Sequence, residues 1–121
     1  MIFLIAEDNL QMRQSIKRFL LKSVPNHHTF YEASDGSEAV KQYDRFSPDW
    51  VVMDIEMLPM DGLTASKTIL GSHPTAKIIV LTSYDDAGYR KAAHDAGTFA
   101  FVSKEHLDDL KNILSTQHKR D

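Results

Sequence analysis

The segment Val51–Gly62, VVMDIEMLPMDG, contains an apolar run that ends abruptly on an acid. Asp54 closes the run, Glu56 follows two residues later, and a turn containing Pro59 comes next. Such a run is typical of a strand that is buried on both faces of a sheet. An ionised carboxylate, however, is costly to remove from water. Asp54 therefore either marks the point where the strand reaches solvent or carries a charge that the protein uses.

On either side of this segment, short apolar runs alternate with stretches whose apolar residues recur at helical spacing. The runs predict strands at residues 2–6, 28–33, 50–53, 77–81 and 99–102. The other stretches predict a helix that starts at an N-cap, Asp8 or Asn9, and ends before Pro25, and helices at 37–46, 63–70, 86–96 and 105–118. This alternation predicts an α/β fold, a doubly wound five-stranded parallel sheet covered on both faces by five helices. We expect the common flavodoxin-like strand order, 2-1-3-4-5.

Length and composition exclude several classes of protein. The 121 residues are enough for one compact domain, residues 1–121, and too few for two. A net charge of -3 provides no basic field to attract nucleic acid, and the lack of cysteine excludes disulfides and thiolate metal sites. The N-terminus lacks the basic region of a signal peptide, and no apolar run approaches the roughly 20 residues that span a bilayer. We therefore expect a soluble, cytoplasmic domain that binds neither membrane nor nucleic acid.

Residues with reactive or charged side chains follow four of the predicted strands. They are Glu7 and Asp8 after the first strand, Asp54 after the third, Thr82 after the fourth and Lys104 just past the fifth. In open parallel sheets, ligands bind beyond the carboxyl ends of the strands, where the strand order reverses. The expected order makes the first and third strands neighbours, so the three carboxylates should crowd together at one edge.

This set of side chains is suited to holding a phosphoryl group. Crowded carboxylates repel one another unless one takes up a proton or a cation lies between them. Mg²⁺ prefers oxygen ligands and keeps open positions for water or phosphate. Lys104 would neutralise phosphoryl oxygens, Thr82 would donate a hydrogen bond, and Asp54 would be the nucleophile that forms an acyl phosphate. The run that ends on Asp54 would then aim a carboxylate at phosphorus.

These residues resemble the receiver domain of two-component response regulators. The resemblance rests on Glu7-Asp8, the pattern D-x-x-M…P-M-D-G around Asp54, Thr82, and Lys104 after a strand that carries Phe101, and it covers essentially the whole chain. It implies that Asp54 accepts a phosphoryl group from a sensor histidine kinase or a phosphotransfer protein. It also implies that Mg²⁺ (or Mn²⁺) binds to Asp8, Asp54 and the backbone carbonyl of Glu56, and to Glu7 through water.

The resemblance further implies a conformational switch. Thr82 and Phe101 match the family's switch pair, in which the hydroxyl moves toward the phosphoryl group and the ring turns inward. The change would remodel the face made by the fourth helix, fifth strand and fifth helix, and would control an output domain or a downstream protein. Homodimer formation on phosphorylation is a further expectation. Such a domain is not an enzyme, although it assists its own phosphorylation and dephosphorylation.

Three positions depart from the family's pattern. Leu58 separates Met57 from Pro59, so we expect an altered loop that keeps the site intact. Glu105 stands where most members have proline. Receivers with LuxR-type output domains often have an acid at this position. A cis bond before a non-proline residue costs about 2.5–4 kcal/mol, so we expect a trans Lys104–Glu105 bond with the lysine still turned toward Asp54. Phe101 replaces the commoner tyrosine.

Two other interpretations stay open from the sequence. A haloacid-dehalogenase-like phosphohydrolase also uses an aspartate nucleophile, Mg²⁺, threonine and lysine, although its nucleophile lies on the first strand. A receiver-like interaction module that never takes phosphate is the other. Each site residue alone also has an ordinary explanation, such as a helix cap or a surface charge.

Finally, Tyr84, two residues after Thr82, is predicted to hinder the water that hydrolyses the acyl phosphate.

Overall fold

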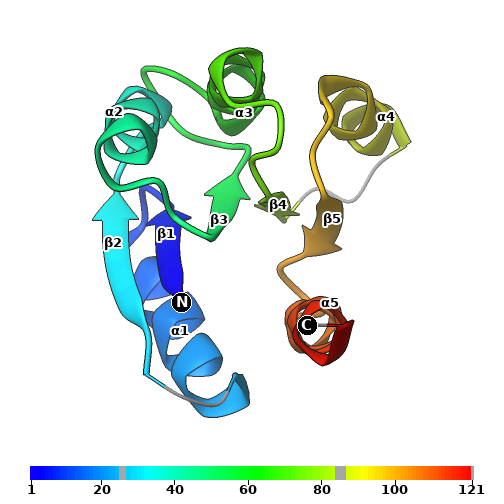
Figure 1. Ribbon diagram of the computed structural model, residues 1–121. Helices are drawn as coiled ribbons and strands as arrows, with labels where there is room; N and C mark the ends of the chain where they lie inside the picture. The colour runs from blue at the N-terminus through cyan, green and yellow to red at the C-terminus, as the bar shows by residue number, and fades with distance from the viewer. Residues whose placement is uncertain (25–26, 84–86, 121) are drawn as a thin grey trace.

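The computed structural model describes residues 1–24, 27–83 and 87–120, and within them it forms a single sheet with helices on both sides (Figure 1). The strands are β1 (Ile2–Ala6), β2 (Thr29–Ala33), β3 (Trp50–Asp54), β4 (Ile78–Thr82) and β5 (Ala100–Ser103). The helices are α1 (Leu10–Ser23), α2 (Gly36–Phe46), α3 (Gly62–Ser72), α4 (Ala87–Ala96) and α5 (Asp108–Arg120).

All neighbouring strands pair in parallel, in the order β2-β1-β3-β4-β5. The predicted fold class and strand order are therefore confirmed. In this order β1 lies between β2 and β3, although β2 follows β1 in the chain. The carboxyl ends of β1 and β3 thus become neighbours, as the crowding argument required.

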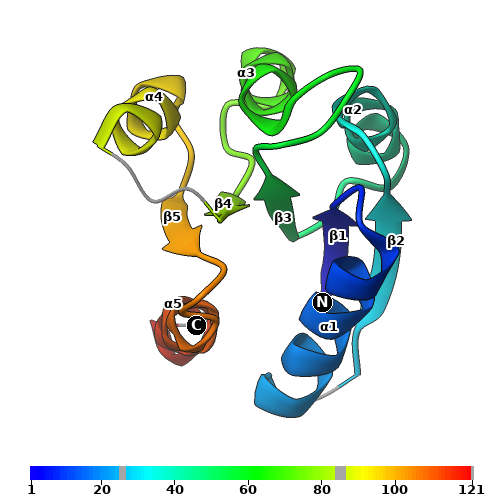
Figure 2. The same cartoon turned by 180° about the vertical axis from the view of Figure 1, so that it is seen from behind.

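The helices divide between the two faces of the sheet: α2, α3 and α4 cover one face, and α1 and α5 cover the other (Figures 1 and 2). Alternate residues of the central strands enter the two cores. Leu4, Val51 and Val80 pack in the core under α2, α3 and α4. Ile5 and Val52 pack in the core under α1 and α5. Because both faces of each central strand are covered, these strands are apolar up to their carboxyl ends, where β3 ends on Asp54 and β4 on Thr82.

Three helices begin at an acidic or amide side chain that caps them. Asn9 Oδ1 accepts the N–H of Met12 at 2.8 Å, Asp35 Oδ1 caps α2 in the same way, and Asp61 Oδ1 caps α3. The sequence allowed either Asp8 or Asn9 to cap α1. The structure assigns the cap to Asn9, so the Asp8 carboxylate is left for the edge of the sheet.

The predicted bounds differ from the structure most at α5, which begins at Asp108 and not at residue 105. The backbone N–H of Lys104 still donates to Thr82 O at 2.8 Å, so the chain remains tied to β4 beyond the end of β5. A turn then follows, in which the N–H of Glu105 donates to Ser103 Oγ and that of His106 to Ser103 O. The helix starts only after this turn. The predicted break at Pro25-Asn26 and the expected helix start at Asp86 fall outside the described residues.

Among the described residues, no helix combines the length and apolar character that crossing a bilayer requires.

Candidate functional site

The residues selected from the sequence lie together at the carboxyl edge of the sheet. Glu7 and Asp8 directly follow β1, Asp54 is the last residue of β3, Thr82 is the last residue of β4, and Lys104 directly follows β5. Hydrogen bonds hold the short segments that carry them. For example, the N–H of Glu7 donates to Ala33 O at 3.0 Å and so extends the pairing of β1 with β2.

Three carboxylates form one acidic cluster around the lysine. Glu7, Asp8 and Asp54 each offer an oxygen, and these oxygens lie within 4.8 Å of one another. Glu7 and Asp54 are buried, with 1% and 3% of their surface exposed, whereas Asp8 is exposed. Lys104 Nζ lies 2.6 Å from Glu7 Oε1 and 3.3 Å from Asp54 Oδ1. The ammonium group therefore contacts both buried acids, and Asp8 lies on the solvent side.

The environment separates the pKa values of these acids. Burial, together with the charge of Glu7, raises the pKa of Asp54 to about 7 despite the opposing effect of Lys104. Burial acts to raise the pKa of Glu7, but the contact with Lys104 and the hydrogen bonds with Asp8 and the Asn9 backbone together outweigh it and lower that pKa. The hydrogen bond between Asp8 and Glu7 raises the pKa of Asp8. Burial disfavours the charged form of Lys104, but its contacts with Glu7 and Asp54 raise its pKa. Glu7 and Lys104 thus form an ion pair beside an Asp54 that holds a proton readily.

The cluster fits a hard divalent cation. Glu7 Oε1 and Asp54 Oδ1 are buried and accept no oriented hydrogen bond from the described residues, although the Lys104 ammonium lies near both. The cluster offers only carboxylate oxygens, the ligands that Mg²⁺ prefers, and the exposed Asp8 leaves a side open to water. Two of the expected metal ligands, Asp8 and Asp54, therefore have suitable positions, with Glu7 beside them.

The carboxylate of Glu56 lies apart from that cluster and contacts Thr82. The Thr82 hydroxyl is fully buried and donates to Glu56 Oε1 at 3.1 Å. The sequence assigned metal binding to the backbone carbonyl of Glu56, and it did not predict this side-chain bond because strand ends do not show which side chains turn toward each other. The Thr82 hydroxyl therefore has a side-chain partner in Glu56.

The loop between β3 and α3, in which Leu58 separates Met57 from Pro59, lies beside the acidic cluster. Leu58 is 83% exposed, so its side chain projects into solvent. The N–H of Gly62 donates to Ile55 O at 2.9 Å, and a Cβ on Gly62 would lie 1.9 Å from Asp54 O. Only glycine permits this close approach of α3 to the end of β3. Gly62 and the end of β3 are therefore held together next to the acidic cluster, and the altered loop stays a prediction.

The structure also describes the other two positions that depart from the family's pattern, Glu105 and Phe101. The Lys104–Glu105 peptide is trans, and Lys104 points to Asp54 as expected. Phe101 is half-buried against the core under α4, and the guanidinium of Arg90 lies 4.7 Å from the centre of its ring. Tyr84 falls outside the described residues, so its predicted effect on hydrolysis stays a prediction.

A comparison with known protein families matches nearly the whole chain to one family. The model of the response regulator receiver domain matches residues 3–115. The chain belongs to this family. It is therefore a receiver domain of two-component signalling, a class of phosphorylation switches, and its acidic cluster lies at the family's site. Receiver domains are typically not enzymes.

Individual relatives show the same kinship. The chain is 38% identical to chemotaxis protein CheY of Listeria monocytogenes over 106 residues, which cover 88% of this chain and 87% of that protein. It is 36% identical to a protein-glutamate methylesterase/protein-glutamine glutaminase of Alkalilimnicola ehrlichii, covering 97% of this chain but only 31% of that protein. Among solved structures, a LuxR-family DNA-binding response regulator from Staphylococcus aureus has a TM-score of 0.85 at 26% identity, covering 95% of this chain and 96% of that one.

Proposed function

We propose that this receiver domain is switched by phosphorylation of Asp54, with a phosphohistidine of a sensor histidine kinase or phosphotransfer protein as donor. The observation that supports this most directly is the position of Lys104 Nζ, in contact with both Glu7 and Asp54 inside a buried acidic cluster. A lysine held there can neutralise phosphoryl oxygens as they arrive, because its own charge is already placed and needs no rearrangement.

The chain's own residues provide the nucleophile and orient the group. An ionised Asp54 oxygen attacks phosphorus in line with the phosphorus–nitrogen bond of phosphohistidine. The new oxygen–phosphorus bond forms as the phosphorus–nitrogen bond breaks, and the bonding pair stays on the imidazole nitrogen, which takes up a proton. Lys104 pairs with one phosphoryl oxygen, and the Thr82 hydroxyl donates to another. Loss of the proton from Asp54 precedes attack, since burial raises its pKa to about 7.

Asp8, Asp54 and the backbone carbonyl of Glu56 would hold Mg²⁺ or Mn²⁺, with Glu7 acting through water. The bound cation supplies positive charge that favours the ionised form of Asp54 and balances the charge on the phosphoryl oxygens. Glu7 is already paired with Lys104 at 2.6 Å, which supports an indirect role for this residue.

The switch begins at Thr82. Its hydroxyl donates to Glu56 in the structure, so contact with a phosphoryl oxygen requires exchange of that partner. Movement of Thr82 would free space into which Phe101 turns from its half-buried position beneath Arg90. Phe101 lies on β5 and Arg90 on α4, so the change would reach the face made by α4, β5 and α5.

This face would then control an output domain or a downstream protein. The likeness to a LuxR-family DNA-binding response regulator supports transcription as the output, and Glu105 after the lysine agrees with it. Under this proposal residues 1–121 form the receiver unit, which lies in the cytoplasm, forms homodimers when phosphorylated and makes no direct contact with DNA or membrane. The match to the receiver family and the place of Asp54 at the end of β3 support the receiver over the haloacid-dehalogenase alternative, whose nucleophile lies on the first strand.

Incubation with acetyl phosphate and Mg²⁺, followed by intact mass spectrometry, tests the proposal. We expect a single phosphoryl adduct that requires Mg²⁺ and is absent from Asp54→Asn. An adduct that persisted in this variant would place the nucleophile elsewhere. A wild-type protein that formed no adduct with either acetyl phosphate or a phosphorylated kinase would instead support the interaction module that never takes phosphate.

A further inference from the structure

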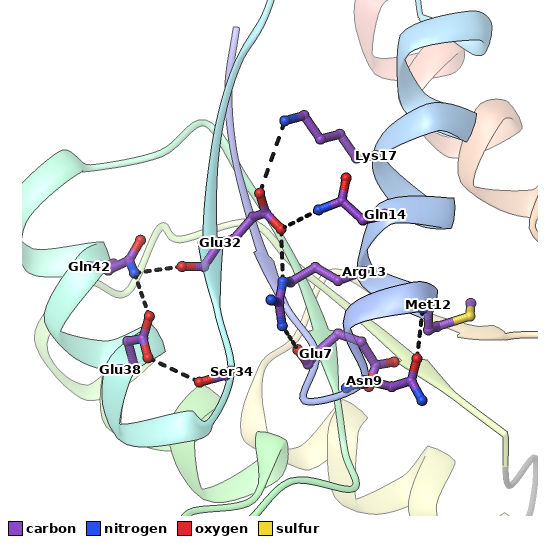
Figure 3. Close-up of polar contacts among 10 residues, drawn as sticks. All are labelled: Glu7, Asn9, Met12, Arg13, Gln14, Lys17, Glu32, Ser34, Glu38 and Gln42. Atoms are coloured by element: carbon purple, nitrogen blue, oxygen red, sulfur yellow. Dashed lines mark hydrogen bonds and ion pairs between the residues drawn. The ribbon is translucent and has the colours of Figure 1, made fainter.

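One arginine outside the acidic cluster is joined directly to its backbone. Arg13 lies on α1, and its Nη1 donates to the carbonyl oxygen of Glu7 at 2.7 Å. The Nε of the same guanidinium pairs with Glu32 Oε1 on β2 at 2.8 Å (Figure 3). One planar group thus bridges the end of β1 to the adjacent strand. The Arg13 side chain is only 15% exposed, so this bridge is largely shielded from water.

The far end of the bridge is fixed by two helices. Glu32 Oε1 also accepts a hydrogen bond from Gln14 Nε2 at 3.1 Å, and Glu32 Oε2 lies 4.0 Å from Lys17 Nζ, both on α1. The backbone carbonyl of Glu32 accepts from Gln42 Nε2 on α2 at 2.6 Å. These contacts surround Glu32 in Figure 3, and they leave it little freedom to move away from Arg13.

The other end of the bridge holds the backbone at Glu7, the first residue of the acidic cluster. The carbonyl that Arg13 holds belongs to the peptide unit that joins Glu7 to Asp8, and a peptide unit is planar. Holding this oxygen therefore sets the direction in which the chain leaves β1 and the position of the Asp8 Cα. The Glu7 side chain is held as well, since its Oε2 accepts the N–H of Asn9 at 3.2 Å.

We propose that Arg13 is a positioning residue for the cation site: its bridge from Glu7 O to Glu32 holds the Glu7–Asp8 peptide plane so that both carboxylates lie beside Asp54. The inference rests on the proposed function, because the cation site is part of it. In this role Arg13 itself would touch neither the cation nor the phosphoryl group. It acts through the backbone, as partners behind metal ligands commonly do.

The direction in which Mg²⁺ affinity changes when Arg13 is replaced distinguishes a positioning role from a purely electrostatic one. Arg13 carries a positive charge close to a site for a cation, so its removal should strengthen Mg²⁺ binding if only Coulomb repulsion mattered. Loss of positioning predicts the opposite, weaker binding. Arg13→Lys keeps the charge but cannot span two acceptors with a rigid fork, so it should also bind Mg²⁺ more weakly.

Isothermal titration with Mg²⁺ tests this on the whole chain, with Arg13→Lys, Arg13→Met and the control Arg18→Met. Arg18 is an exposed arginine on the same helix that contacts neither Glu7 nor Glu32 in the described hydrogen bonds and ion pairs. We expect the Kd for Mg²⁺ to rise about tenfold in both Arg13 variants, the lower end of the range for partners of metal ligands. The Kd of Arg18→Met should equal that of wild type or fall below it. Urea unfolding in EDTA establishes that each variant is folded at the titration temperature.

Several outcomes would overturn the inference. An unchanged or lower Kd in the Arg13 variants would show that the bridge does not position the site, and an equal rise in Arg18→Met would show that the effect is not specific to it. If Arg13→Met does not fold, Arg13→Lys and Glu32→Gln carry the test, and their effects on Kd should be non-additive because they break one bridge. A wild-type protein that bound no Mg²⁺ would refute the cation site itself, and the bridge proposal with it.

Discussion

At the scale of single residues, Asp54 carries the largest electrostatic cost in the site. Its folded-state pKa of about 7 exceeds the ordinary value of 3.8, so the folded chain holds the proton more tightly than the unfolded chain does. The stability contributed by protonated Asp54 is fully present below the unfolded pKa and is lost as the pH rises to about 7.

This sign gives a pH prediction for the metal-free protein. Between about pH 4 and pH 7, the free energy of unfolding of wild type should fall relative to that of Asp54→Asn, by at most about 4 kcal/mol. The asparagine removes the titrating group but keeps its size, so contributions from groups far from Asp54 cancel in the difference. Urea denaturation in EDTA at several pH values measures it. A difference that did not change with pH would show that Asp54 is not appreciably protonated in the folded state.

Gly62 allows a second prediction at this scale. The Cβ introduced by Gly62→Ala would lie 1.9 Å from Asp54 O, a backbone atom that cannot move without displacing β3. We expect a loss of about 1–3 kcal/mol in unfolding free energy or more, with slower phosphorylation of Asp54. Gly71→Ala on the same helix is the matched control, since its Cβ would meet nothing within 4 Å. There alanine should be neutral or stabilise by up to about 1 kcal/mol. Equal effects at both sites in urea denaturation would contradict the close approach.

At the scale of elements, the cap of α1 links helix stability to the acidic cluster. Asn9 Oδ1 accepts the N–H of Met12, while the backbone N–H of Asn9 donates to Glu7 Oε2. Asn9→Ala should lower the unfolding free energy by about 1 kcal/mol, and Asn9→Ser should restore most of it because serine also caps well. Thermal or urea unfolding of the three proteins checks this. A serine variant no more stable than the alanine variant would show that the cap contributes little.

At the scale of the whole molecule, the folded state alone brings Glu7, Asp8 and Asp54 within 4.8 Å, so Mg²⁺ should bind it in preference to the unfolded chain. At a hundredfold excess over its Kd, Mg²⁺ would add about 2.7 kcal/mol of stability. We expect melting temperature to rise with Mg²⁺ in wild type and much less in Asp8→Ala and Asp54→Ala. Without metal, the same variants should equal or exceed wild type because they relieve repulsion. Equal Mg²⁺ shifts in all three proteins would place the metal elsewhere.

The sequence by itself determined the fold class, and the common strand order of that class predicted which side chains would meet at the edge of the sheet. Strands buried on both faces are apolar throughout, as in IFLIA at Ile2–Ala6, and acids at their carboxyl ends stand out against such runs. Once β1 and β3 are neighbours, the convergence of Glu7 and Asp54 follows from topology alone. The trans Lys104–Glu105 bond followed from the covalent cost of the cis form.

Only the tertiary structure decided which side chains pair in the site and around it. The choice of Asn9 over Asp8 as the cap, the bond from Thr82 to Glu56, and the bridge from Arg13 to Glu7 and Glu32 depend on how helices rotate and pack on the sheet. The late start of α5 depends on a backbone bond from Lys104 to β4, a strand distant in sequence. Periodicity shows which face of an element is buried, but it carries no information about the direction of a polar side chain, because that direction is set by partners from other parts of the chain.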